Sequence, residues 1–242
     1  MSRIPTPASI EASPAAAQPL LEAVKKQLGS APNLFRIVAN SPAGLEGYLD
    51  LNGALGKGQL DVRTRNRIAL TVADANGCTY CLSAHTYLGK NIAKLDEAEM
   101  VNNQRGASSD PKADVAVAFA SKLVKQRGHV TEVDVQAVKN AGYTDAQLVE
   151  IILHVALNTL TNYVNTALAT DVDFPVVSPL GEYGGLCAVA VSMGERVPSD
   201  ATAPSQFDGR TFRFSSAEAK AMFDADPATF VRKADANWPR LK

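Results

Sequence analysis

Long hydrophobic runs are missing from this sequence. The longest apolar stretches, such as residues 148–156, are interrupted by Glu150 and His154, and none is long enough to cross a bilayer. Arg3 lies near the N-terminus, but no apolar run follows it, so the start of the chain does not resemble a secretory signal peptide. We therefore expect a protein that makes no membrane contact and stays in the cytoplasm.

An excess of charge of either sign is also missing. The 24 Lys and Arg residues nearly balance the 25 Asp and Glu residues, which leaves a formal net charge of -1. A nucleic-acid-binding protein needs a basic face to neutralise phosphates, so nucleic acid is not expected as a partner. The 46% hydrophobic content is ordinary for a globular protein, and 242 residues suffice for one large domain with a small appendage.

Cysteine is scarce, with Cys78, Cys81 and Cys187 in the whole sequence. Three cysteines do not make a disulfide framework. In a reducing compartment, a Cys-x-x-Cys pair such as Cys78 and Cys81 indicates redox activity or metal binding instead.

Most of the chain has the apolar periodicity of helices. An arm rich in proline, residues 1–19, is expected to be irregular. Spacing and capping signals then predict a helical domain over 20–175. Its helices are expected at 20–28, 33–39, 42–55, 61–76, 79–90, 95–104, 111–127, 131–140 and 145–170, with ends uncertain by about two to four residues.

The character of the sequence changes after residue 175. Glycines cluster at Gly181, Gly184 and Gly185, and the alternating run 210–214 is typical of a strand. We expect an all-α fold with a small α+β C-terminal module over 176–242.

Cys78, Cys81 and His85 are spaced so that they share one face of a helix. A helix N-terminus at Cys78 and an imidazole one turn from Cys81 are both expected to lower a thiol pKa. A thiolate attacks peroxide to give a sulfenic acid, which the neighbouring thiol captures as a disulfide. The pattern therefore predicts a two-electron dithiol/disulfide switch, and no cofactor is expected.

Two other interpretations of these cysteines remain open. Zinc binding would need a fourth ligand, and the chain has no second Cys-x-x-Cys. Inert core thiols are also possible, since free cysteine is often buried. His154 fits a core or interface position better than a catalytic one. The polar segment 158–165 fits packing and capping, although a role in lining the site or a subunit contact is the alternative.

Residues 65–86 resemble the core of the alkylhydroperoxidase D-like proteins of the carboxymuconolactone decarboxylase superfamily, and the resemblance extends from about Leu34 to residue 175. Its motif is Glu-x11-Cys-x2-Cys-x3-His. The resemblance implies a helical bundle that forms a homo-oligomer. It also implies that Cys81 attacks a hydroperoxide, that Cys78 resolves the product, and that His85 activates Cys81. An external thiol or lipoyl-type protein would supply electrons, and no metal is implied.

The chain departs from that motif at two positions. Asn66 occupies the place of the motif glutamate and cannot transfer a proton at neutral pH, so Asp74 is the nearby acid that we consider as its substitute. Tyr80 lies between the cysteines where the alkylhydroperoxidase D proteins proper have histidine. The helix dipole alone favours Cys78 as the more acidic thiol, whereas the resemblance favours Cys81, and we follow the resemblance.

The C-terminal segment resembles a YHS-type module. The cysteines that some such modules carry after the aromatic strand are replaced here by Ser215, Ser216 and Ala219, which favours a structural or recognition role over metal binding. The sequence thus predicts a cysteine-dependent peroxidase-type oxidoreductase. The alternative is a non-catalytic redox sensor or scaffold with a partner- or metal-binding tail.

Overall fold

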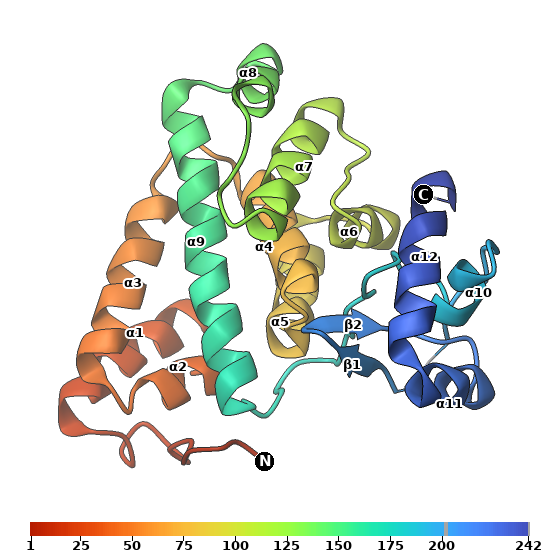
Figure 1. Ribbon diagram of the computed structural model, residues 1–242. Helices are drawn as coiled ribbons and strands as arrows, with labels where there is room; N and C mark the ends of the chain where they lie inside the picture. The colour runs from red at the N-terminus through yellow and green to blue at the C-terminus, as the bar shows by residue number, and fades with distance from the viewer. Residues whose placement is uncertain (201–202, 242) are drawn as a thin grey trace. The chain divides into compact units, whose positions relative to one another are not determined.

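The computed structural model describes residues 1–200 and 203–241 and divides into two compact units, residues 1–178 and 179–242 (Figure 1). Unit 1 is helical, and unit 2 combines helices with a small sheet. The predicted all-α fold with a small α+β C-terminal module is therefore confirmed. No helix among the described residues is long and apolar enough to span a membrane.

The helices of unit 1 follow the predicted order, and their ends lie within about two residues of the predicted ones. They are α1 (Gln18–Leu28), α2 (Asn33–Val38), α3 (Pro42–Gly56), α4 (Val62–Ala75), α5 (Thr79–Leu88), α6 (Glu97–Gln104), α7 (Pro111–Lys125), α8 (Glu132–Asn140) and α9 (Asp145–Leu168). A short 3-10 turn, η1 (Ala15–Ala17), precedes α1, and a π-helical turn, η2 (Gly89–Ala93), extends α5. The predicted helix over 79–90 therefore changes its hydrogen-bonding pattern after Leu88.

Side-chain caps explain where several of these helices begin. The carboxylate of Asp61 accepts hydrogen bonds from the backbone N–H groups of Arg63 and Thr64 at the start of α4. At the start of α9, Thr144 and Gln147 form a reciprocal capping box. These interactions satisfy N–H groups that have no partner within the helix.

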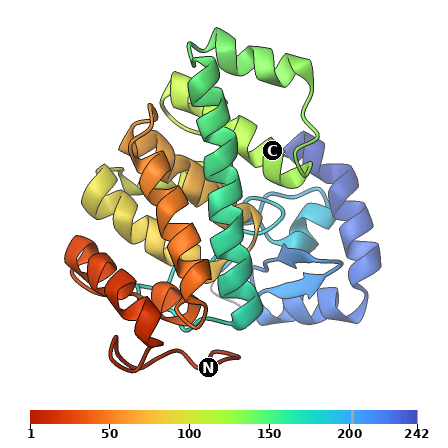
Figure 2. The same ribbon diagram turned by 90° about the vertical axis from the view of Figure 1, so that its left-hand side faces the viewer.

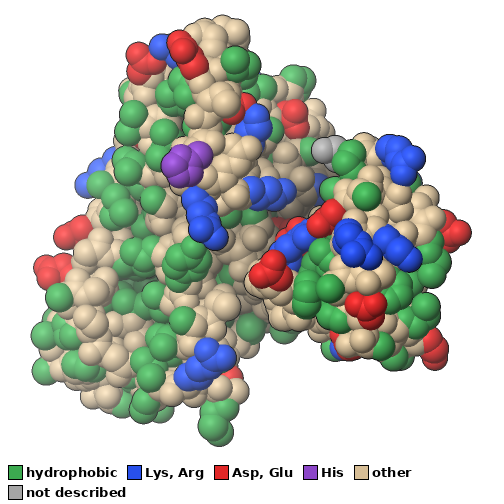
Figure 3. Space-filling view, viewed as in Figure 1, with side chains coloured by type: hydrophobic (Ala, Val, Ile, Leu, Met, Phe, Trp, Pro, Cys, Tyr) green, Lys and Arg blue, Asp and Glu red, His purple; other side chains and the backbone are tan. Residues whose placement is uncertain are grey.

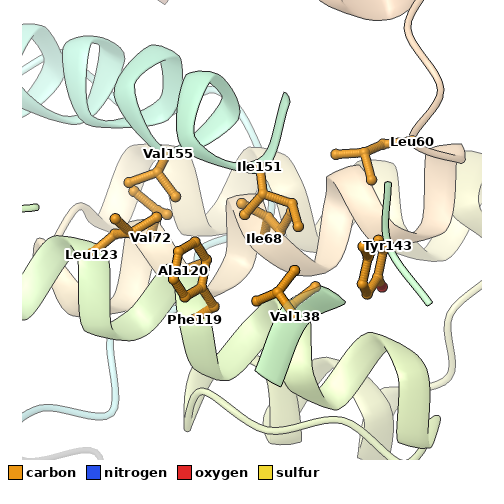
Figure 4. Packing of buried hydrophobic residues seen from close by; sticks show 11 residues of the cluster. Leu60, Ile68, Val72, Phe119, Ala120, Leu123, Val138, Tyr143, Ile151 and Val155 are labelled. Carbon is orange, nitrogen blue, oxygen red and sulfur yellow. The ribbon is translucent and has the colours of Figure 1, made fainter. Parts of the chain in front are cut away.

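Helix α4 is the centre of unit 1. It packs against α5, α6, α7 and α9, and its residues from Asn66 to Ala73 are all buried. Ile68 and Val72 of α4 meet Ile151 of α9 and Phe119 of α7 in the main hydrophobic core (Figure 4). Figure 2 shows the long helix α9 running beside α3, which it also contacts.

The N-terminal arm has little regular structure but is held in place. The backbone N–H of Arg3 donates to the carbonyl of Leu168 at 2.7 Å, and Ile10 is buried. Helix α1 begins at Gln18, slightly earlier than predicted, because Pro19 occupies one of its first positions.

Unit 2 contains the two-stranded antiparallel sheet of β1 (Ser205–Phe207) and β2 (Arg210–Phe212), so the predicted strand over 210–214 is confirmed for its first three residues. Its helices are α10 (Ala188–Ser192), α11 (Ala217–Ala225) and α12 (Pro227–Leu241). Four buried aromatic side chains form its core: Tyr183, Phe212, Phe214 and Phe223.

Charged side chains of both signs are mixed on the molecular face in Figure 3, and apolar side chains lie between them. That view contains no extended area of a single charge, in agreement with the net charge of -1.

Candidate functional site

The two cysteines of the motif lie at the start of α5. Gly77 adopts the left-handed conformation (φ 65°) after α4, as the sequence predicts, and the backbone N–H of Cys78 donates to the carbonyl of Ala73 at 2.9 Å. This turn makes Cys78 the N-cap of α5, where its sulfur accepts a hydrogen bond from the N–H of Cys81 at 3.3 Å. Both thiols are free and buried.

The sulfur of Cys81 is surrounded by hydrogen-bond donors. The thiol of Cys78 donates to it, and Asn165 Nδ2 of α9 donates from 3.2 Å. The polar side chains of Asn162 and Thr161 act on the Cys81 pKa in the same direction. The donors, Cys78 first among them, hold the pKa of Cys81 below its ordinary value although burial acts in the opposite direction.

The pKa of Cys78 moves the other way. Its donated hydrogen bond to Cys81 and its burial both raise the pKa of the Cys78 thiol. The side-chain amide of Asn165 donates to the sulfur of Cys81, and this contact favours Cys81 as the thiolate of the pair. The N-cap position of Cys78 acts in the opposite direction, because its sulfur accepts from the backbone N–H of Cys81.

His85 lies one turn after Cys81 and is partly buried. Burial lowers the pKa of its imidazole to about 4, while a hydrogen bond with the side chain of Asn158 opposes the shift. His85 is therefore neutral at pH 7. We expected the imidazole to lower the pKa of Cys81, but the largest contributions come from the thiol, amide and hydroxyl donors around the sulfur.

Asn66, at the motif glutamate position, holds the end of α5. Its Nδ2 donates to the backbone carbonyl of His85 at 3.2 Å, and the side chain is 8% exposed. A Cβ atom at Gly89 would lie 2.7 Å from Asn66 Oδ1 and 2.9 Å from Met100 Sδ, so a larger residue there would displace the side chain of Asn66 or Met100. The amide thus positions the backbone that carries His85.

Two further predicted residues have different surroundings. Tyr80 is buried; its hydroxyl accepts from the N–H of Leu34 at 2.9 Å and bonds to the side chain of Asp173, which ties α5 to α2 and to the segment after α9. Asp74 is partly buried near the end of α4 and does not line the cavity described next. The structure therefore does not bring Asp74 to the site as a substitute for the glutamate.

A cavity of about 740 Å³ opens beside Cys81 and His85. Helices α3, α4, α5 and α9 contribute to its walls. Cys81 lines this cavity and Cys78 does not. A small molecule that enters the cavity therefore meets the sulfur of Cys81.

Several residues that line the cavity were not predicted from the sequence to be part of the site. His154 lines the cavity although the sequence favoured a core or interface role; it is 6% exposed, and burial and the charge of Arg65 lower its pKa to about 4. Asn158 and Thr161 also line the wall, while Asn165 reaches the sulfur. The spacing 154, 158, 161 and 165 places all four on one face of α9, a signal that the sequence contained. Arg65 and Tyr48 gave no such signal.

We also searched the described residues for a metal-binding site. Within residues 1–200 and 203–241, no group of three or more His, Cys, Asp or Glu side chains is arranged to hold a metal ion. Cys187 is buried at the start of α10 in the aromatic core of unit 2.

Comparisons with known proteins bear on the fold that carries this site. Residues 42–122 match the model of the carboxymuconolactone decarboxylase family. The chain is similar to the solved structure of an uncharacterized peroxidase-related protein with an alkylhydroperoxidase AhpD core from Ralstonia eutropha JMP134, with a TM-score of 0.64 and 26% identity over 71% of this chain and 92% of the other. A search of curated proteins finds no match.

Two further solved structures are similar. A peroxidase-related protein from Silicibacter sp. TM1040 has a TM-score of 0.62 and 25% identity over 70% of this chain and 91% of that one. A debrominase in complex with 2,3,4-tribromopyrrole has a TM-score of 0.62 over 72% and 94% of the two chains, but at 17% identity it shows the fold alone. The family match is confined to residues 42–122, and the similar solved structures show that the fold around it is alkylhydroperoxidase D-like.

Proposed function

We propose that this protein is a cysteine-dependent peroxidase that reduces hydroperoxides through a Cys78–Cys81 dithiol/disulfide cycle. The observation that carries the proposal is the position of Cys81, which is the cysteine of the pair that lines the cavity and the one whose pKa is lowered. Similarity to peroxidase-related proteins at about one quarter identity supports the same class of chemistry.

The cycle begins when the Cys81 thiolate attacks a hydroperoxide oxygen. The O–O bond breaks, the sulfur becomes a sulfenic acid, and the alkoxide that leaves takes up a proton to form an alcohol. The Cys78 thiol then attacks the sulfenic sulfur, which forms the disulfide and releases water. An external dithiol restores both thiols and is itself oxidised to a disulfide.

His85 is suited to carry the proton between these steps. Asn158 Nδ2 donates to the carbonyl of His154 at 2.8 Å, so its amide oxygen is the group that accepts from an N–H of the His85 ring. The second ring nitrogen of a neutral imidazole is then a proton acceptor. It takes the proton of a Cys81 thiol and returns it to the alkoxide.

The burial of both cysteines favours a reductant that enters the cavity. Cys78 and Cys81 are 1% and 3% exposed, which keeps them from contact with a cysteine on the surface of another protein. The dithiol on a flexible lipoyl-type arm fits the cavity better, and we propose this class of electron donor.

The test is stopped-flow oxidation of the reduced protein by a hydroperoxide. Cys81→Ser is expected to abolish the first oxidation step, whereas Cys78→Ser keeps that step and accumulates sulfenic acid, which a sulfenic-acid-specific probe followed by mass spectrometry detects. Equal loss in both variants, or loss in neither, contradicts the assigned roles. Steady-state peroxide consumption with a dihydrolipoyl donor separates an enzyme, which turns over many times, from a redox sensor, which is oxidised once.

We also propose that the protein is a homo-oligomer that associates through α9. This helix exposes five apolar side chains, which are Val149, Ile152, Leu153, Leu160 and Tyr163. Light scattering after size-exclusion chromatography tests the assignment, and a monomer at micromolar concentration refutes it. For unit 2 we propose a YHS-like module with a structural or recognition role.

A further inference from the structure

The cavity has a cationic end that the cysteine chemistry does not use. Arg65 of α4 and His154 of α9 both line it. Among the ion pairs of residues 1–200 and 203–241 none includes Arg65, whose guanidinium donates to the carbonyl of Leu55 at 3.4 Å, a long distance for a hydrogen bond. His154 is buried, and its Nε2 has no partner in the described part of the chain.

The carboxylates nearest to this end are already engaged. Glu150 acts on His154 electrostatically, but its oxygens accept from the backbone N–H groups of Gln59 and Leu60 at 2.8 to 2.9 Å. Asp173, the acid that lines the cavity, accepts from the N–H of Asn33 at 2.8 Å and bonds to the Tyr80 hydroxyl. Arg65 therefore faces the cavity with its charge uncompensated by a side chain in contact.

Helix α9 runs past both the reactive sulfur and the cationic end. Along it, Thr161 and Asn158 act on the pKa values of Cys81 and His85, and His154 is close enough to Arg65 for that charge to lower its pKa. Thr161 and His154 are seven residues apart, which corresponds to about 10 Å along a helix at 1.5 Å per residue. A ligand that reaches both ends must therefore be elongated.

Part of the cavity wall is apolar and exposed to solvent. Leu28, Val62 and Ile92 line the cavity, and their side chains are 42%, 42% and 56% exposed. A bound hydrocarbon chain would remove this apolar surface from water.

We propose that Arg65 binds the carboxylate of an apolar hydroperoxide, of the fatty-acid type, and so holds the peroxide group at Cys81. Arg65 is a specificity-determining residue for the reaction under "Proposed function". Only the peroxide part of the inference rests on that proposal, because binding of the carboxylate requires no redox chemistry.

Calorimetric titration of the reduced protein with decanoate and decanamide tests the carboxylate site without any peroxide. The wild type is expected to bind decanoate about ten-fold more tightly than decanamide, because the extra free energy of a hydrogen bond to a charged group corresponds to about one ten-fold change in affinity. Arg65→Gln is expected to abolish the difference, and Arg65→Lys to retain part of it. Arg63→Gln is the matched control, because Arg63 is exposed on the same helix outside this cavity.

Equal affinity of the wild type for decanoate and decanamide overturns the proposal without the use of any variant. An equal loss of affinity for both probes in Arg65→Gln also overturns it, because Arg65 would then only shape the cavity.

A kinetic comparison assigns the site to the peroxide substrate. The second-order rate of Cys81 oxidation by a 9-hydroperoxy fatty acid is expected to fall at least about ten-fold in Arg65→Gln, while the rate with its methyl ester stays unchanged. Equal rates for acid and ester in the wild type refute the role of Arg65 in substrate binding but do not contradict the proposed peroxidase function. If no hydroperoxide oxidises Cys81 while decanoate still binds through Arg65, the proposed function fails and the carboxylate site stands.

Discussion

Replacing Asn165 by alanine tests the origin of the low Cys81 pKa. The amide of Asn165 donates to the sulfur of Cys81 at 3.2 Å, and both side chains are 3% exposed, so water does not replace the lost donor. A hydrogen bond to a charged group contributes about 1.5–3 kcal/mol. Since one pH unit of pKa corresponds to about 1.4 kcal/mol, Asn165→Ala is expected to raise the pKa of Cys81 by about one to two pH units.

The pH dependence of iodoacetamide alkylation measures this change, with the modified residue located by mass spectrometry. Asn140→Ala is the matched control, because Asn140 is an exposed asparagine of α8 far along the chain from both cysteines. The same alkylation midpoint in Asn165→Ala and wild type would refute the view that neutral donors stabilise the thiolate.

Three other changes probe the same structure. Cys78→Ala is expected to raise the pKa of Cys81 measured by alkylation. In Cys78→Ser the pKa of Cys81 is expected to rise less, because the serine hydroxyl can still donate to the sulfur. Equal alkylation midpoints in the two variants contradict this. Glu99→Gln breaks the buried 2.7 Å ion pair with Arg67 and is expected to lower the free energy of unfolding in urea by about 3–5 kcal/mol; a loss below about 1 kcal/mol argues against it. Burial lowers the pKa of His154 from 6.5 to about 4, so the unfolded chain takes up a proton at a higher pH than the folded protein does. The free energy of unfolding therefore decreases as the pH falls from 6.5 towards 4. His154→Gln is expected to reduce that loss in thermal unfolding, and an unchanged pH profile counts against a buried neutral imidazole.

The helices of unit 1 were predictable because their signals are local. Pro42 begins α3, and Gly77 ends the turn after α4, each by its own backbone preference. The proximity of the two cysteines was also predictable, since a spacing of three brings Cys78 to the N-cap and Cys81 into the first turn of α5.

The surroundings of Cys81 were not predictable in the same way. Asn165 contacts the sulfur across 84 positions of sequence, and only the packing of α5 against α9 brings the two together. The position of Arg65 was not predictable either. Nothing in the sequence distinguishes it from a surface residue, and it lines a cavity only because α3, α4 and α9 come together around it. Local periodicity places a side chain on a face, but the identity of the facing helix is a property of the whole fold.

The neutral donors around Cys81 have a consequence for the redox balance of the pair. They stabilise the sulfur only while it carries negative charge, and a disulfide has no charge for them to stabilise. Lowering the free energy of the reduced form makes the disulfide a stronger oxidant, as in oxidoreductases whose reduced state is stabilised. Under the proposed cycle, the donor from Asn165 therefore favours return of the disulfide to the dithiol, which a peroxidase needs before it meets the next peroxide.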